Sequence, residues 1–148
     1  MCNKLRGNVL RGLGTLLVAG MLAASSFAEG PTFSGYVDTQ YGYNFDMPIT
    51  GFMPHMHTRG AGFRYEVTYP DGKNEVLLDI PRYDFNWQLR YEYKSPKLIP
   101  RGSTMKITAV FDNSAGNKAN PDPTKLVRWG SQTVDEMMIG YVEYFRPR

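Results

Sequence analysis

Apolar and polar residues alternate over several short segments of this chain, and a period of two is typical of β-strands with one buried face. The longest such run covers residues 84–93, where apolar side chains occupy every second position: Phe85, Trp87, Leu89, Tyr91 and Tyr93. Polar residues fill the positions between them. We therefore expect a half-buried strand over residues 84–93.

Two further segments, 63–69 and 75–80, flank the tetrapeptide Pro70-Asp71-Gly72-Lys73. Proline presets the backbone angle φ, and glycine accepts a positive φ, so this sequence is typical of a tight turn. The pattern predicts a β-hairpin.

Residues 104–111 alternate again, with Met105, Ile107, Ala109 and Phe111 in phase, and residues 137–145 read as a last strand. Between them, residues 112–130 are polar, rich in Asn, Pro and Gly, and without a clear period. Loops of this length in compact domains are usually functional or disordered.

The connections between these strands are short, and no stretch shows a sustained helical period. Tyrosine and phenylalanine are abundant, with 10 and 8 residues in a chain of 148. These features predict an all-β fold, an antiparallel and jelly-roll-like β-sandwich that forms a single domain after a signal peptide.

The first 28 residues have the three parts of a secretory signal. Basic residues come first, an apolar stretch covers residues 13–24, and Ser26 and Ala28 fit a small-residue cleavage site. The apolar run is short for a membrane span, so we expect cleavage near Ala28 and no transmembrane span in the mature chain. The mature chain would then divide into a lead-in strand at 29–50 and the main domain at 51–148.

Loss of the signal changes the charge balance. The formal net charge is +3, but Lys4, Arg6 and Arg11 leave with the signal, so the remaining Lys and Arg residues equal the 14 Asp and Glu residues. A nearly neutral chain argues against nucleic acid as a partner. The single cysteine, Cys2, also leaves, so no disulfide or thiolate ligand is expected in this secreted or, in a bacterium, periplasmic protein.

Residues 33–45 form a tyrosine-rich alternating segment, and this short stretch resembles the opening strand of bacterial outer-membrane porins. One strand does not make a barrel, because membrane barrels need at least about eight. The simpler interpretation is an edge strand or a flexible lead-in.

The two histidines of the chain, His55 and His57, stand one residue apart. In an extended segment their side chains project from one face, with Cα atoms roughly 6.5–7 Å apart, so both imidazoles can reach one metal ion. The alternative is that both are partly exposed and bond to the backbone. Secretion and the eight methionines of the chain favour copper among the metals, because thioethers suit Cu(I).

The spacing alone does not say which methionine would complete such a site. Met56 lies between the histidines and points to the opposite face, and Met105 is in phase with the apolar residues of its strand. Met137 and Met138 are adjacent, so only one of them can face a given site.

Residues 54–145 carry several motifs that occur together in one known family. The motifs are residues 55–60 (HMHTRG), 65–72 (YEVTYPDG), 83–88 (YDFNWQ), 111–114 (FDNS), 120–123 (NPDP) and 128–137 (RWGSQTVDEM). In these motifs the chain resembles the C-terminal domain of the copper type II, ascorbate-dependent monooxygenases, the family of peptidylglycine α-hydroxylating monooxygenase and dopamine β-monooxygenase, and more closely its bacterial relatives.

The resemblance implies a copper that activates dioxygen for C–H hydroxylation, with His55, His57 and Met137 as ligands and Met138 turned away. It also implies ascorbate as an electron donor and a small-molecule or peptide substrate. In relatives that amidate peptides, arginine and tyrosine bind the substrate carboxylate, and Arg59, Arg64, Arg82 and Tyr83 are the candidates here. Asp135 and Glu136 are expected either to orient ligands or to be solvated.

The chain departs from the family in one respect. A second, electron-transferring copper is bound in the family by three histidines of a preceding domain, whereas this chain has two histidines in all. Hydroxylation would therefore need a separate domain that carries the electron-transfer copper. The alternatives are a non-catalytic secreted copper-binding module and a β-sandwich interaction domain without metal.

Overall fold

The computed structural model describes residues 34–42 and 46–145, and in this part the chain contains strands but no helix. The expected signal peptide lies outside the described residues. The strands are β1 (Ser34–Gly42), β2 (Met47–Met56), β3 (Gly60–Thr68), β4 (Asn74–Ile80), β5 (Tyr91–Ile99), β6 (Thr104–Asp112) and β7 (Met138–Tyr144). Accordingly, no helix long and apolar enough to cross a membrane occurs among the described residues.

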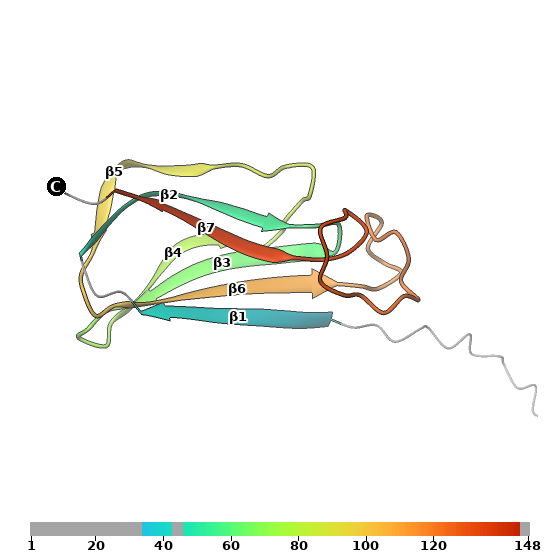
Figure 1. Cartoon of the computed structure of the whole chain (residues 1–148), viewed down its shortest axis with the longest axis horizontal. Coiled ribbons are helices and arrows are strands. Elements are labelled where there is room, and N and C mark those ends of the chain that lie inside the picture. The colour runs from blue at the N-terminus through green and yellow to red at the C-terminus, as the bar shows by residue number, and fades with distance from the viewer. Residues whose placement is uncertain (1–33, 43–45, 146–148) are drawn as a thin grey trace, which may run out of the picture.

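The strands form two antiparallel sheets that pack face to face (Figure 1). One sheet has the order β1-β6-β3-β4, and the other has the order β5-β2-β7. This arrangement confirms the all-β sandwich predicted from the alternating pattern.

The core lies between the two sheets. Its fully buried side chains come from both, and they are Met47, Ile49, Phe52, Met56, Phe63, Tyr65, Val67, Ile99, Met105, Ile107 and Ala109. The in-phase residues Met105, Ile107 and Ala109 of β6 are among them, as expected for a strand with one buried face.

The predicted hairpin is confirmed, because β3 and β4 pair in antiparallel register from Phe63 opposite Ile80 to Thr68 opposite Asn74. Gly72 in the connecting turn has a φ of 83°, which glycine adopts without the steric cost that other residues would meet. The last predicted strand is also confirmed, as β7. Residues 113–137 form a long connection without a named strand, as expected for 112–130.

The segment with porin-like alternation forms β1 over its described residues. β1 lies at an edge of its sheet and pairs with β6 along its whole length, from Ser34 opposite Asp112 to Gly42 opposite Thr104. The lead-in strand is therefore part of the sandwich. The expected division between residues 50 and 51 falls inside β2.

The strand predicted over residues 84–93 is wrong for its first seven residues. β5 begins at Tyr91, and residues 81–90 form a loop in which Trp87 is 68% exposed and Leu89 is 43% exposed. Asp84 begins a turn here: its side-chain Oδ1 accepts the Asn86 N–H at 2.8 Å, and its carbonyl accepts the Trp87 N–H at 2.9 Å. These local bonds satisfy the backbone in place of a strand partner.

β2 contains a β-bulge, and its pairing with both β5 and β7 shifts register between Ile49 and Gly51. Before the bulge, Met47 and Ile49 face the core, whereas Phe52 and Met56 face it afterwards. A Cβ atom at Gly51 would lie 2.7 Å from the Tyr91 carbonyl oxygen, so the bulge brings two backbones closer than a side chain allows.

Candidate metal centre

His55 and His57 lie at the end of β2, next to the 81–90 loop and the long 113–137 connection (Figure 1). His55 is within the strand, and His57 is one residue beyond it, where the chain turns towards β3. The Gly60 N–H closes this turn by donating to the His57 carbonyl at 3.0 Å. His57 is only 5% exposed, while His55 is partly exposed.

The two imidazole rings lie close together in an edge-on arrangement. Their ring centroids are 5.2 Å apart, and their planes are nearly perpendicular at 87°. With metal–nitrogen bonds of about 2.0 Å, a ring centroid lies about 3.2 Å from the metal, so this separation corresponds to a ligand–metal–ligand angle of roughly 110°. If both Nε2 atoms point to one metal ion, this spacing fits two ligands of a tetrahedral centre.

The hydrogen bonds of the two rings define which nitrogen carries the proton. His55 Nδ1 lies 2.6 Å from Gln88 Oε1, and the Gln88 amide nitrogen donates to the Phe85 carbonyl at 2.8 Å, which turns the amide oxygen towards His55. His57 Nδ1 lies 3.2 Å from the Asp135 carbonyl oxygen. Both partners are acceptors, so in each neutral ring Nδ1 carries the hydrogen and Nε2 has the lone pair that a metal needs.

The 81–90 loop covers an edge of β2 that β5 leaves open. The pairing of β2 with β5 ends where Phe52 meets Tyr91. Beyond that point the Tyr83 hydroxyl accepts the Met56 N–H and donates to the Met56 carbonyl, both at 2.9 Å. A side chain thus replaces a neighbouring strand beside the histidines, and Phe85 adds an edge-on ring contact to His57 at 6.1 Å.

Glu136 holds the other side of the site. Its carboxylate accepts the His57 N–H at 3.1 Å and the Arg59 N–H at 2.7 Å. The Arg59 guanidinium lies 3.8 Å from Glu136 and donates to Asn113 Oδ1 and to the Val134 carbonyl, both at 2.8 Å. We call Glu136, Arg59 and Asn113 the acidic clamp. All three residues are buried, and burial raises the pKa of the Glu136 carboxyl group despite the donors around it.

The acidic clamp bears on the expected roles of Glu136 and Arg59. Glu136 is not a solvated carboxylate, because it bonds to the backbone of the turn that carries His57, and Asp135 contributes through its carbonyl. Arg59 is ruled out as a substrate-binding arginine in this conformation, since it is 2% exposed and committed to the clamp. Arg64, on β3, pairs with Glu66 of the same strand at 3.5 Å.

Met137 immediately precedes β7, at the end of the strand nearest to His57. β2 and β7 pair with His55 opposite Ile139 and end their pairing at Met56 opposite Met138. Met138 packs against the core with the buried Met56. If the alternation of β7 extended one residue further, Met137 would project to the face opposite Met138, which is the face of His55.

The sequence patterns assign no role to Gln88, Phe85 or Asn113 at this site, and they name Tyr83 only as a candidate for binding a substrate carboxylate. These residues lie far from the histidines along the chain and meet them through the sheet topology. The motifs at 83–88 and 111–114 contain these residues, but nothing in the motifs indicates a bond to His55 or to the clamp.

Neither a further cluster of metal-binding side chains nor a known relative supports the site. No set of three or more His, Cys, Asp and Glu side chains converges as metal ligands would in the part of the chain that the structure describes, so a metal here would depend on the two imidazoles and a thioether. No protein-family model matches the chain, and comparison with curated proteins also found no match.

Proposed function

We propose that this chain is a secreted copper protein in which His55, His57 and Met137 bind one copper ion of the kind that ascorbate-dependent monooxygenases use. The observation that carries the proposal is the pair of Nδ1 hydrogen bonds, to Gln88 and to the Asp135 carbonyl. They leave Nε2 of both rings available as ligands.

The donor set fits copper better than the other common metals. Two neutral imidazoles and one soft thioether suit Cu(I), and three ligands leave a position open for a further molecule. When bound, such a copper supplies dioxygen activation for attack on a substrate C–H bond. The residues of the chain orient the imidazoles through Gln88 and the Asp135 carbonyl, and the acidic clamp holds the backbone that presents His57.

Catalysis would require an electron donor such as ascorbate and a second copper domain. The chain has two histidines in all, and both belong to the proposed site. The complete reaction would therefore need an electron-transfer copper bound outside these residues.

The experiment is elemental analysis of copper in purified protein, combined with electron paramagnetic resonance of the Cu(II) form. We expect about one copper per chain and nitrogen hyperfine structure from two imidazoles. His55→Ala and His57→Ala should lose both signals, and Met137→Leu should weaken Cu(I) binding. Met105→Leu, which changes a thioether in the core, is the matched control. Equal copper in wild type and His55→Ala would refute the proposal.

Two further measurements separate the alternatives. A non-catalytic copper module predicts no oxygen consumption when the copper-loaded protein, ascorbate, the partner domain and substrate are combined. An interaction domain without metal predicts that a copper chelator changes neither the thermal stability nor the binding of a partner.

A further inference from the structure

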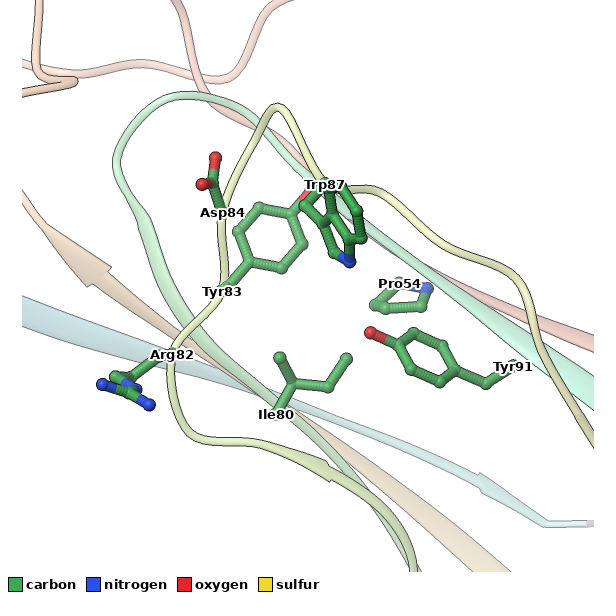
Figure 2. A pocket seen from close by; sticks show the side chains of 7 residues that line it. All are labelled: Pro54, Ile80, Arg82, Tyr83, Asp84, Trp87 and Tyr91. Carbon is green, nitrogen blue, oxygen red and sulfur yellow. The ribbon is translucent and has the colours of Figure 1, made fainter.

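A small pocket opens beside the 81–90 loop, and it is distinct from the two histidines. Its volume is about 150 Å³, and its walls come from β2, the end of β4, the loop and the start of β5. Figure 2 shows the ring of Tyr83, the indole of Trp87, Pro54, Ile80 and Tyr91 around a common space.

The walls of the pocket are mainly apolar. Pro54 is buried and Ile80 is half-buried, whereas Trp87 is 68% exposed. A large aromatic side chain at the rim of a concave site gains little from solvent, but it contributes much contact area when a ligand covers it. Tyr83 cannot turn away, because its hydroxyl is bonded to both backbone groups of Met56.

Two polar groups face the space between these walls. In Figure 2 the indole nitrogen of Trp87 and the hydroxyl of Tyr91 both point into it, while the Arg82 guanidinium and the Asp84 carboxylate point away. The Asp84 carboxylate also accepts the Asn86 N–H. The indole N–H only donates, and a phenol hydroxyl can donate. The pocket thus offers donors and no facing charge, which suits a neutral ligand with an oxygen acceptor.

The volume limits the size of the ligand. A cavity of about 150 Å³ accommodates one benzene ring in another protein. Aromatic rings at the sides of the space allow offset or edge-to-face contacts with such a ring.

We propose that this pocket binds a single neutral aromatic ring that carries a carbonyl oxygen, with Trp87 and Tyr91 as the hydrogen-bond donors. The proposal does not depend on copper. The loop nevertheless links the two sites, because Gln88 follows Trp87 in sequence and bonds to His55.

The test uses benzamide as the probe and copper-free protein. The chain has two tryptophans, so Trp129→Phe leaves Trp87 as the only one. We expect a saturable change in Trp87 fluorescence with a dissociation constant of about 1 mM, as is reasonable for a ligand of this size. An unsaturable response would overturn the proposal.

Two comparisons test the hydrogen bonds. Tyr91→Phe keeps the ring but removes the hydroxyl, and it should weaken benzamide binding by about threefold to tenfold. Tyr141→Phe changes an exposed tyrosine on β7 and should leave benzamide binding unchanged. Benzamidine, a cation of the same shape without an acceptor, should bind at least about tenfold more weakly. Equal affinities for the two tyrosine variants, or for the two probes, would contradict the assigned donors.

Discussion

His55 and His57 are separated by a single residue, but the groups that hold them differ in kind. His57 is buried and depends on the acidic clamp, where a carboxylate, a guanidinium and an amide bond to one another and to the backbone. His55 is partly exposed and depends on the neutral side chain of Gln88 in the 81–90 loop. The support of His57 is therefore part of the buried structure. We expect that the support of His55 can be altered with little cost to the fold.

Removal of the clamp carboxylate should have the largest effect on stability. Glu136→Ala leaves the buried N–H groups of His57 and Arg59 without an acceptor and the Arg59 charge without a partner. We expect a loss of about 3–5 kcal/mol in the free energy of unfolding, measured by urea denaturation. Glu75→Ala, which removes the half-exposed partner of Lys97, should cost about 0–1 kcal/mol. Similar losses for both variants would mean that the clamp contributes no more than a surface pair.

Detachment of the loop should have an intermediate effect. Tyr83→Phe removes the hydroxyl that satisfies both backbone groups of the fully buried Met56. The expected loss is about 1–3 kcal/mol, because buried groups then lack partners. Tyr141→Phe is the control and should change the free energy of unfolding by less than about 0.5 kcal/mol. If the two variants unfold at the same urea concentration, the loop is not anchored through Tyr83.

High pH should weaken the same anchor. Burial raises the pKa of Tyr83 above its ordinary value of 10.0. Above pH 10 the unfolded chain therefore loses this proton while the folded chain keeps it, so the free energy of unfolding falls as the pH rises. Below pH 10 the contribution is fully retained. Urea denaturation between pH 8 and pH 11, compared for wild type and Tyr83→Phe, should give a shallower decline in the variant, and parallel declines would refute this assignment.

Loss of the Gln88 amide should have the smallest effect on the fold. Gln88→Ala should cost less than about 1 kcal/mol of stability, because Gln88 is only half-buried. Copper affinity should nevertheless fall by about tenfold to a hundredfold, since the partner that fixes the His55 ring is gone. Competition with a copper chelator measures this, with the exposed Gln132→Ala as the control. Unchanged copper affinity in Gln88→Ala would show that Gln88 does not orient a ligand.

Much of the sandwich follows from local patterns. The 63–80 hairpin, the strand with Met105, Ile107 and Ala109, and the last strand all combine alternation with long-range pairing partners, and all three form. The 84–90 segment shows equally clear alternation, but Asp84 and Gln88 bond to their own backbone and form a loop. Alternation therefore predicts a strand only where polar side chains do not offer the backbone a local partner.

For the candidate site, the sequence predicts the histidine pair but not the residues that hold it. The spacing of His55 and His57 indicates from the sequence alone that the rings share a face, and their rings do lie 5.2 Å apart. The partners Gln88, Asp135 and Glu136 are 33 to 79 residues away from them in sequence. No short-range pattern encodes such bonds, because they arise from the pairing of β2 with β7 and from the placement of the loop.

The bulge in β2 has a consequence for how this site arises. Relative to β7, it adds a single residue to β2 between Ile49 and Gly51, and this residue changes which alternate positions of the strand face the core. If the same sequence formed a strand of regular alternation, His55 would lie on the core side with Met47 and Ile49, and Met56 would lie on the outer side. Deletion of one residue at the bulge would instead leave both histidines on the outer face, because Ile49 and Phe52 would then be two positions apart and in phase. A search for this site in other chains should therefore test the phase of the strand as well as the presence of the His-x-His pair.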